Sequence, residues 1–217
     1  MGDKSIIQFF LEGGVWMWCI AAIAIFALAI FLERLWVLYA KSSINKDKFV
    51  NHVERSILAG DLNSAVNYCN DRKTPLNNIV KAGLISVMNK GSNDEVQTSM
   101  DVAALREVPY VEKRTPWLAL FGNVATLLGL LSTVAGMIQS FQSVQQVDPA
   151  EKASMLATGI SVAMNGTMMG LLVAIPCLLA SALLTAKTQK ILDGIHEISV
   201  ATLNLILQNR EKFPARS

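Results

Sequence analysis

The chain has 217 residues, of which 52% are hydrophobic and only 17% are charged, and its formal net charge is +2. Its mean hydropathy is +0.39. The apolar residues lie in long runs, which is typical of a membrane protein and unusual for a soluble one. So small a net charge does not indicate nucleic-acid binding, and we expect no nucleic-acid partner. The two histidines and three cysteines are scattered, so the sequence predicts no metal site, no cofactor and no disulfide framework.

The first apolar run predicts a transmembrane helix near the N-terminus. Residues 1–14 form a short amphipathic segment that ends at a glycine pair, and we expect it at the membrane interface or in the periplasm. Residues 15–32 carry no charge and are long enough to cross a membrane. A signal peptide is the competing interpretation, but no basic region precedes the run and no convincing small-residue cleavage site follows it. We therefore expect a retained transmembrane helix over residues 15–40.

Residues 41–115 form a polar region with repeated helix signals. Leu58–Asp61 resembles the end of one helix and the start of the next, and Thr74 before Pro75 fits a helix N-cap. Asn89–Gly91 fits a helix stop, and Ser92 or its neighbour fits the next cap. No alternating apolar pattern predicts strands, and no nucleophile, base or phosphate loop is visible. We expect a helical cytoplasmic domain, and we do not expect an enzyme.

Two further apolar runs predict the second and third transmembrane helices, at residues 116–140 and 159–186. A polar loop, residues 141–158, joins them and contains a possible helix start at Asp148-Pro149. Residues 187–217 form a tail that is amphipathic at first. Basic residues close to the spans gather in the region after the first span and in this tail. The positive-inside rule therefore places both in the cytoplasm, and it places the N-terminus and the loop in the periplasm.

Both later runs carry small residues at helical spacing, which give each helix one thin face. In a membrane such faces let two helices approach closely. Proline within a membrane helix frees a carbonyl one turn earlier and permits a bend. We expect helix packing at Gly122, Gly129, Gly136, Gly159, Gly166, Gly170 and Pro176.

Thr133 and Thr167 lie near the middle of these two runs, among the glycines. The bland interpretation is strong, because threonine in a membrane helix usually bonds its own backbone one turn back. For Asn123 and Asn165 we prefer an interhelical hydrogen bond to a direct role. No Asp, Glu, Lys, Arg or His lies in the three apolar runs, residues 15–32, 116–140 and 159–186. A protein that moves protons usually needs such a residue there, so a partner would have to supply the titratable group.

These residues resemble a known family. The chain resembles the MotA/TolQ/ExbB proton-channel family, most closely its ExbB and TolQ branch. The first membrane signature of that family is similar to Ala125–Val134 with Gly136–Ile138, and the second is similar to Gly166–Leu172 with Ala174–Pro176. The glycine pair at Gly13-Gly14, the exit from the first span at Glu33-Arg34 and the turn at Ala59–Leu62 also look like this family. The resemblance covers nearly the whole chain.

The resemblance implies an all-α integral membrane protein that forms a homo-oligomeric ring, a pentamer, in the bacterial inner membrane. Its second and third helices would line a pore around an ExbD/TolR-type single-span partner that carries a titratable Asp. Thr133 and Thr167 would face that Asp, and we expect the proton pathway also to include Asn165, Ser132 and Ser161. Proton flow would drive work at the periplasm or outer membrane through a TonB/TolA-like or motility client.

Three positions depart from the family pattern. Several relatives carry Glu where this chain has Val162, and many have Gly and Trp at the positions of Ser132 and Ala135. The subfamily therefore stays open, with import energisation, envelope maintenance and gliding motility as alternative outputs. A second hypothesis from another class is a non-conducting membrane scaffold that assembles or stabilises a partner protein.

Overall fold

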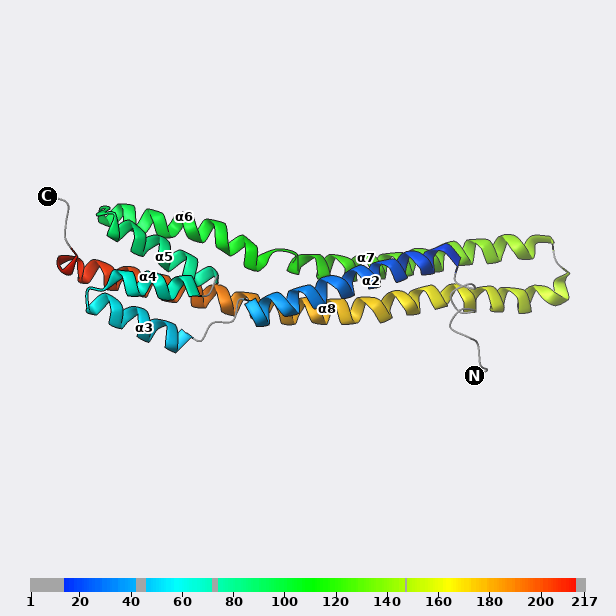
Figure 1. Cartoon of the computed structure of the whole chain (residues 1–217). Coiled ribbons are helices and arrows are strands. Elements are labelled where there is room, and N and C mark those ends of the chain that lie inside the picture. The colour runs from blue at the N-terminus through cyan, green and yellow to red at the C-terminus, as the bar shows by residue number, and fades with distance from the viewer. Residues whose placement is uncertain (1–13, 42–45, 72–73, 147, 214–217) are drawn as a thin grey trace. The chain divides into compact units, whose positions relative to one another are not determined.

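The computed structural model describes residues 14–41, 46–71, 74–146 and 148–213, and all the regular structure in these ranges is helical (Figure 1). The chain divides into two compact units. The membrane unit comprises Met1–Arg34 and Arg114–Leu183, and the helical unit comprises Leu35–Lys113 and Leu184–Ser217. The N-terminal segment predicted at residues 1–14 lies outside the described residues except for Gly14.

The membrane unit contains α2 (Gly14–Trp36), α7 (Thr115–Ser143) and the first part of α8 (Pro149–Gln208). Three helical stretches, one containing each of these helices, are long and apolar enough to cross a membrane. The number of membrane-capable helices is therefore the predicted one. Many of their large apolar side chains are exposed, Leu127 and Leu172 among them at 63% each. Such surfaces suit lipid or another protein rather than water.

The ends of α7 and α8 follow local chemistry. Pro116 lies in the first turn of α7, where a missing N–H breaks no hydrogen bond, and Arg114 before it adopts a left-handed conformation with φ 65°. α8 begins at Pro149, directly after Asp148, as the helix-start pattern predicted. Most of the segment predicted as a loop, residues 141–158, is helical, because its polar residues mark a change of polarity and are still compatible with helix.

The helical unit contains α3 (Lys46–Leu58), α4 (Leu62–Asp71), α5 (Pro75–Met88), α6 (Asn93–Glu112) and the rest of α8. The predicted helix boundaries are confirmed here. Thr74 Oγ1 accepts a hydrogen bond from the Asn77 N–H, and Ser92 forms a reciprocal capping box with Glu95. Gly60 turns the chain between α3 and α4 with φ 75°. The core is apolar and includes Phe49, Val53, Ile57, Leu76, Ile79, Val80, Leu84 and Ile206.

The tail predicted at residues 187–217 is mostly a direct continuation of α8, which stays helical to Gln208. A short 3₁₀ turn follows at Arg210–Lys212, and Phe213 is buried. Within the same unit, a π-helical turn, η1 (Val37–Lys41), follows α2, and the Lys187 ammonium lies 4.8 Å from the centroid of the Tyr39 ring. The helix does not stop where its apolar stretch ends, because no Gly-Pro type stop signal occurs there.

Candidate functional site

α7 and α8 approach so closely that two of their glycines, Gly129 and Gly170, face backbone atoms of the other helix. A Cβ atom built on Gly129 would lie 3.1 Å from the carbonyl oxygen of Gly166. One built on Gly170 would lie 2.7 Å from the carbonyl oxygen of Ala125 and 2.9 Å from the Cα of Gly129. Real Cβ atoms essentially never show contacts under 3.0 Å, so Gly170 admits glycine and little else, whereas at Gly129 the facing backbone would have to shift by a few tenths of an ångström.

The other small residues predicted at the packing face meet side chains. A Cβ on Gly136 would lie 2.7 Å from the Cβ of Ala163, and one on Gly122 would lie 3.0 Å from the Cγ of Leu178. On α8, added Cβ atoms at Gly159 and Gly166 would collide with Ser140 and Ser132 of α7, with Cβ–Cβ separations of 2.7 Å in both cases. Pro176 is exposed and lines a separate apolar pocket of about 390 Å³ between α2, α7 and α8.

At the centre of this contact, the hydroxyls of Thr133 and Thr167 are hydrogen-bonded to each other across the two helices. The Thr167 hydroxyl also lies within hydrogen-bonding distance of the Gly129 carbonyl, at 3.1 Å, and the Thr133 hydroxyl lies 3.2 Å from the same oxygen. Thr133 has a further acceptor, the carbonyl of Ala163, at 3.4 Å. Thr133 therefore makes the ordinary hydrogen bond to the backbone carbonyl one turn back, but this bond belongs to a set of hydrogen bonds that joins both helices.

A third hydroxyl reaches the same carbonyl. Ser132 is buried, and its Oγ donates to the Gly129 oxygen at 2.7 Å. Three hydroxyls thus surround one carbonyl, and the sequence did not predict this shared acceptor. Asn165 is half-buried and Ser161 is exposed, and among the described residues neither side chain makes a hydrogen bond with the threonine pair. The structure therefore brings Ser132 to the pair but does not bring these two.

The hydroxyls of Thr133, Thr167 and Ser132 can donate and accept hydrogen bonds, but they cannot take up or release a proton as a carboxylate does. A hydroxyl offers one donor and two lone pairs and does not ionise near neutral pH. The two apolar runs that hold the pair, residues 116–140 and 159–186, contain no Asp, Glu, Lys, Arg or His. Among the residues that the structure describes, no three His, Cys, Asp or Glu side chains are grouped to hold a metal. A titratable group at this site would have to come from another chain.

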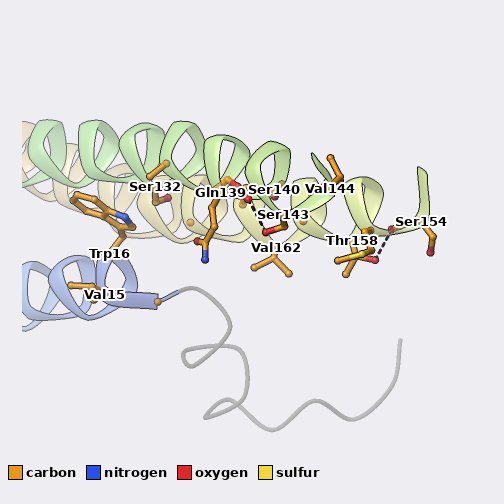
Figure 2. A pocket seen from close by; sticks show the side chains of 17 residues that line it. Val15, Trp16, Ser132, Gln139, Ser140, Ser143, Val144, Ser154, Thr158 and Val162 are labelled. Carbon is orange, nitrogen blue, oxygen red and sulfur yellow. Dashed lines mark hydrogen bonds between the residues drawn. The ribbon is translucent and has the colours of Figure 1, made fainter. Parts of the chain in front are cut away.

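The site adjoins a larger polar pocket of about 710 Å³ between the start of α2, the second half of α7 and the first turns of α8 (Figure 2). Its lining includes Ser132, Ser140 and Thr158, together with Trp16 of α2, whose side chain Figure 2 labels. The sequence reasoning missed this pocket. The spacing of Ser132, Gln139 and Ser143, seven and four residues apart, places them on one face of α7 and could have revealed it.

Comparison with known proteins gives consistent similarities. Residues 71–197 match the family described as the MotA/TolQ/ExbB proton channel family. An ExbB homolog of Methanothermobacter thermautotrophicus, described as a biopolymer transport protein, is 28% identical over 200 residues, covering 91% of this chain and 69% of that protein. The Tol-Pal system protein TolQ of Pseudomonas aeruginosa is 34% identical over 97 residues, 45% of this chain and 42% of TolQ.

A solved structure of C. jejuni MotAB has a similar fold. Its TM-score is 0.54 at 17% sequence identity, and the likeness covers 91% of this chain and 82% of that one. At this identity the likeness concerns the fold alone. The ExbB and TolQ branch predicted from the membrane signatures is supported by the curated relatives.

Proposed function

This chain belongs to the MotA/TolQ/ExbB proton channel family, and we propose that it is the stator subunit of a motor driven by the proton-motive force. In this proposal five copies form a ring in the bacterial inner membrane around an ExbD/TolR-type single-span partner. The region between the first and second spans and the C-terminus lie in the cytoplasm, and the N-terminus lies in the periplasm. The motor performs work at the periplasm or outer membrane, through a client such as a TonB/TolA-like protein or a motility component.

One observation carries the proposal: a hydrogen-bonded pair of hydroxyls, Thr133 and Thr167, sits between two helices whose apolar runs, residues 116–140 and 159–186, contain no Asp, Glu, Lys, Arg or His. Polar groups are costly in a membrane interior and usually have a function there. A pair that carries protons only by hydrogen bonding needs a carboxylate beside it. A partner that brings a membrane Asp would complete the chemistry.

The pair suits a carboxylate that is protonated and deprotonated in turn. With the partner's Asp ionised, a threonine hydroxyl turns its proton toward the carboxylate and stabilises the charge. When the Asp is protonated, that hydroxyl rotates and donates its hydrogen bond to the Gly129 carbonyl or to the other threonine instead. Its oxygen can then accept a hydrogen bond from the protonated acid. We place Asn165, Ser132 and Ser161 in the same pathway, where they stabilise water or the carboxylate.

Threonine-to-valine variants test the proposal, because valine keeps the shape and removes the hydroxyl. The complex is reconstituted with its partner in liposomes, and proton uptake is followed with a pH-sensitive dye under an imposed potential. We expect T133V and T167V to lower proton uptake by about tenfold or more, as removal of one directed donor does at other sites. Thr133→Ser should keep most of the uptake, because it keeps the hydroxyl.

Thr126 provides a matched control on the same helix. Its hydroxyl donates to the Gly122 carbonyl of its own helix at 3.1 Å. We expect T126V to conduct normally and to assemble like wild type. Normal proton uptake by both T133V and T167V, at normal protein levels, would overturn the channel assignment and favour the non-conducting scaffold, which also predicts indifference of the cellular process to an uncoupler.

A further inference from the structure

The polar pocket of the membrane unit is uncharged, and its lining combines five hydroxyls and the Gln139 amide with a larger apolar surface. The described residues that form its wall come from α2, α7 and α8, and none of them is Asp, Glu, Lys, Arg or His. Its volume of about 710 Å³ has room for on the order of twenty water molecules, at roughly 30 Å³ each. The smaller pocket near Pro176 is different, because apolar side chains line it throughout.

Four of the five hydroxyls in the lining of the polar pocket donate to backbone carbonyls, among them Ser132 to Gly129. Ser140 donates to the Gly136 carbonyl at 2.8 Å, Ser143 to Gln139 at 2.9 Å, and Thr158 to Ser154 at 3.0 Å, each within its own helix (Figure 2). Each hydroxyl has a single proton, so what remains available to the pocket is its oxygen lone pairs. These lone pairs and the Gln139 amide, which both donates and accepts, can hold water, whereas a lipid chain would leave them without hydrogen-bond partners.

The inner end of the pocket reaches the threonine pair. Ser132 and Gly166 both belong to its lining, and they directly precede Thr133 and Thr167 in the chain. The Ser132 hydroxyl bonds the same Gly129 carbonyl that the two threonine hydroxyls approach. Ser132 in the wall of the pocket and the two threonines are therefore joined through one acceptor, the Gly129 carbonyl oxygen.

We infer that this pocket is a water-filled access path within a single subunit, by which protons reach the threonine pair from the side of the membrane where α7 ends and α8 begins. The inference rests on the proposed function and names the path that feeds its site. An uncharged path with hydroxyl and amide groups along it holds water and passes protons along that water.

Cysteine accessibility in the assembled complex tests the path. The native cysteines are first replaced, and single cysteines are then placed deep in the pocket by A135C or V162C. The control is V134C, because Val134 is the neighbour of Ala135 on α7 and does not line the pocket. A membrane-impermeant, cationic methanethiosulfonate is added from the outside. We expect A135C and V162C to react about tenfold faster than V134C, because hydrocarbon excludes a charged reagent.

Measurements of proton uptake then show whether filling the pocket blocks the path of the protons, and not only whether a reagent can enter it. Unmodified A135C should conduct, and modification by the bulky cationic reagent should lower its uptake several-fold, whereas the small methyl-transferring reagent should leave most of it. Three results would overturn the inference: equal reactivity of A135C and V134C, reaction only with a lipid-soluble maleimide, or full modification without loss of uptake. If T133V and T167V still block uptake in those cases, the proposed function stands and only the path fails.

Discussion

Each threonine hydroxyl of the pair carries one proton, so only one directed chain of hydrogen bonds exists at a time. Thr133 donates to Thr167, which then donates to the Gly129 carbonyl, or Thr167 donates to Thr133, which then donates to Gly129 or Ala163. The two arrangements need only hydroxyl rotation. A pair that reverses its direction without moving the backbone is suited to a group whose charge alternates.

Cys69 gives a residue-scale prediction in the helical unit. Its side chain is 1% exposed, and burial raises the pKa of its thiol from 9.0 to about 11, although the nearby Lys81 charge opposes the shift. Between these pH values the folded chain therefore binds more protons than the unfolded chain, and the free energy of unfolding falls as pH rises. Well below pH 9 the thiol is protonated in both states and contributes no pH dependence.

Cysteine-to-alanine substitution isolates this effect from other groups that titrate in the same range. Unfolding of the detergent-solubilised chain is followed by circular dichroism at several pH values from 8 to 11, for wild type and C69A. We expect the wild type to lose stability more steeply over this range. Parallel curves for the two proteins would contradict the expected coupling.

The sequence predicted the positions of the site residues better than their contacts. Thr133 and Thr167 were placed on thin, glycine-rich faces, because helical spacing decides which residues share a face. Their mutual hydrogen bond depends on the register of two helices, and a single sequence does not specify that register. For the same reason the sequence grouped Asn165 and Ser161 with the pair, whereas only Ser132 lies against its shared carbonyl.

At the scale of the elements, the contact between α7 and α8 depends on which atoms face each glycine. Gly170 faces backbone of α7, namely the Ala125 carbonyl oxygen and the Gly129 Cα. At Gly122, the two nearest atoms belong to the flexible side chain of Leu178, which can move. The two glycines therefore look equivalent in the sequence but differ in what they tolerate.

Alanine at these two positions tests that difference. We expect G170A to destabilise the helix pair by about 1–3 kcal/mol, the usual cost of overpacking. We expect G122A to be close to neutral, because alanine gains up to about 1 kcal/mol in a helix and offsets a mild repacking of Leu178. Unfolding in mixed micelles of increasing SDS fraction measures both. A loss for G122A as large as that for G170A would contradict the assignment.

The elements themselves were predictable where a local signal exists. Thr74 and Ser92 are caps, and Pro149 begins α8, because short-range chemistry decides helix starts. The length of α8 was not predicted. The polarity changes near Lys187 with no accompanying stop signal, and polarity decides where a helix meets water rather than where it ends.

At the scale of the whole molecule, α8 contributes to both units, and the 3₁₀ turn that follows it, η3 (Arg210–Lys212), contacts two turns of the helical unit. Arg210 Nη2 donates to the carbonyl of Gly91, in the turn between α5 and α6. Lys212 Nζ donates to the carbonyl of Leu58, the last residue of α3, at 3.2 Å. Carbonyls at helix C-termini lack partners within the helix and favour cations, so these contacts stabilise the two turns.

Removing the Arg210 and Lys212 side chains should increase local opening at the end of α3 and in the turn between α5 and α6, and not elsewhere. In R210A/K212A we expect faster amide hydrogen exchange around the end of α3 and the turn between α5 and α6, equivalent to about 1–3 kcal/mol for the part-buried Arg210 bond, and less for the exposed Lys212 bond. Exchange in α7 should not change, because these contacts lie wholly in the helical unit. Lys190 is exposed on α8, so K190A is the matched control for loss of a charge on that helix. Equal acceleration in K190A would show that net charge, and not the two directed contacts, governs these two turns.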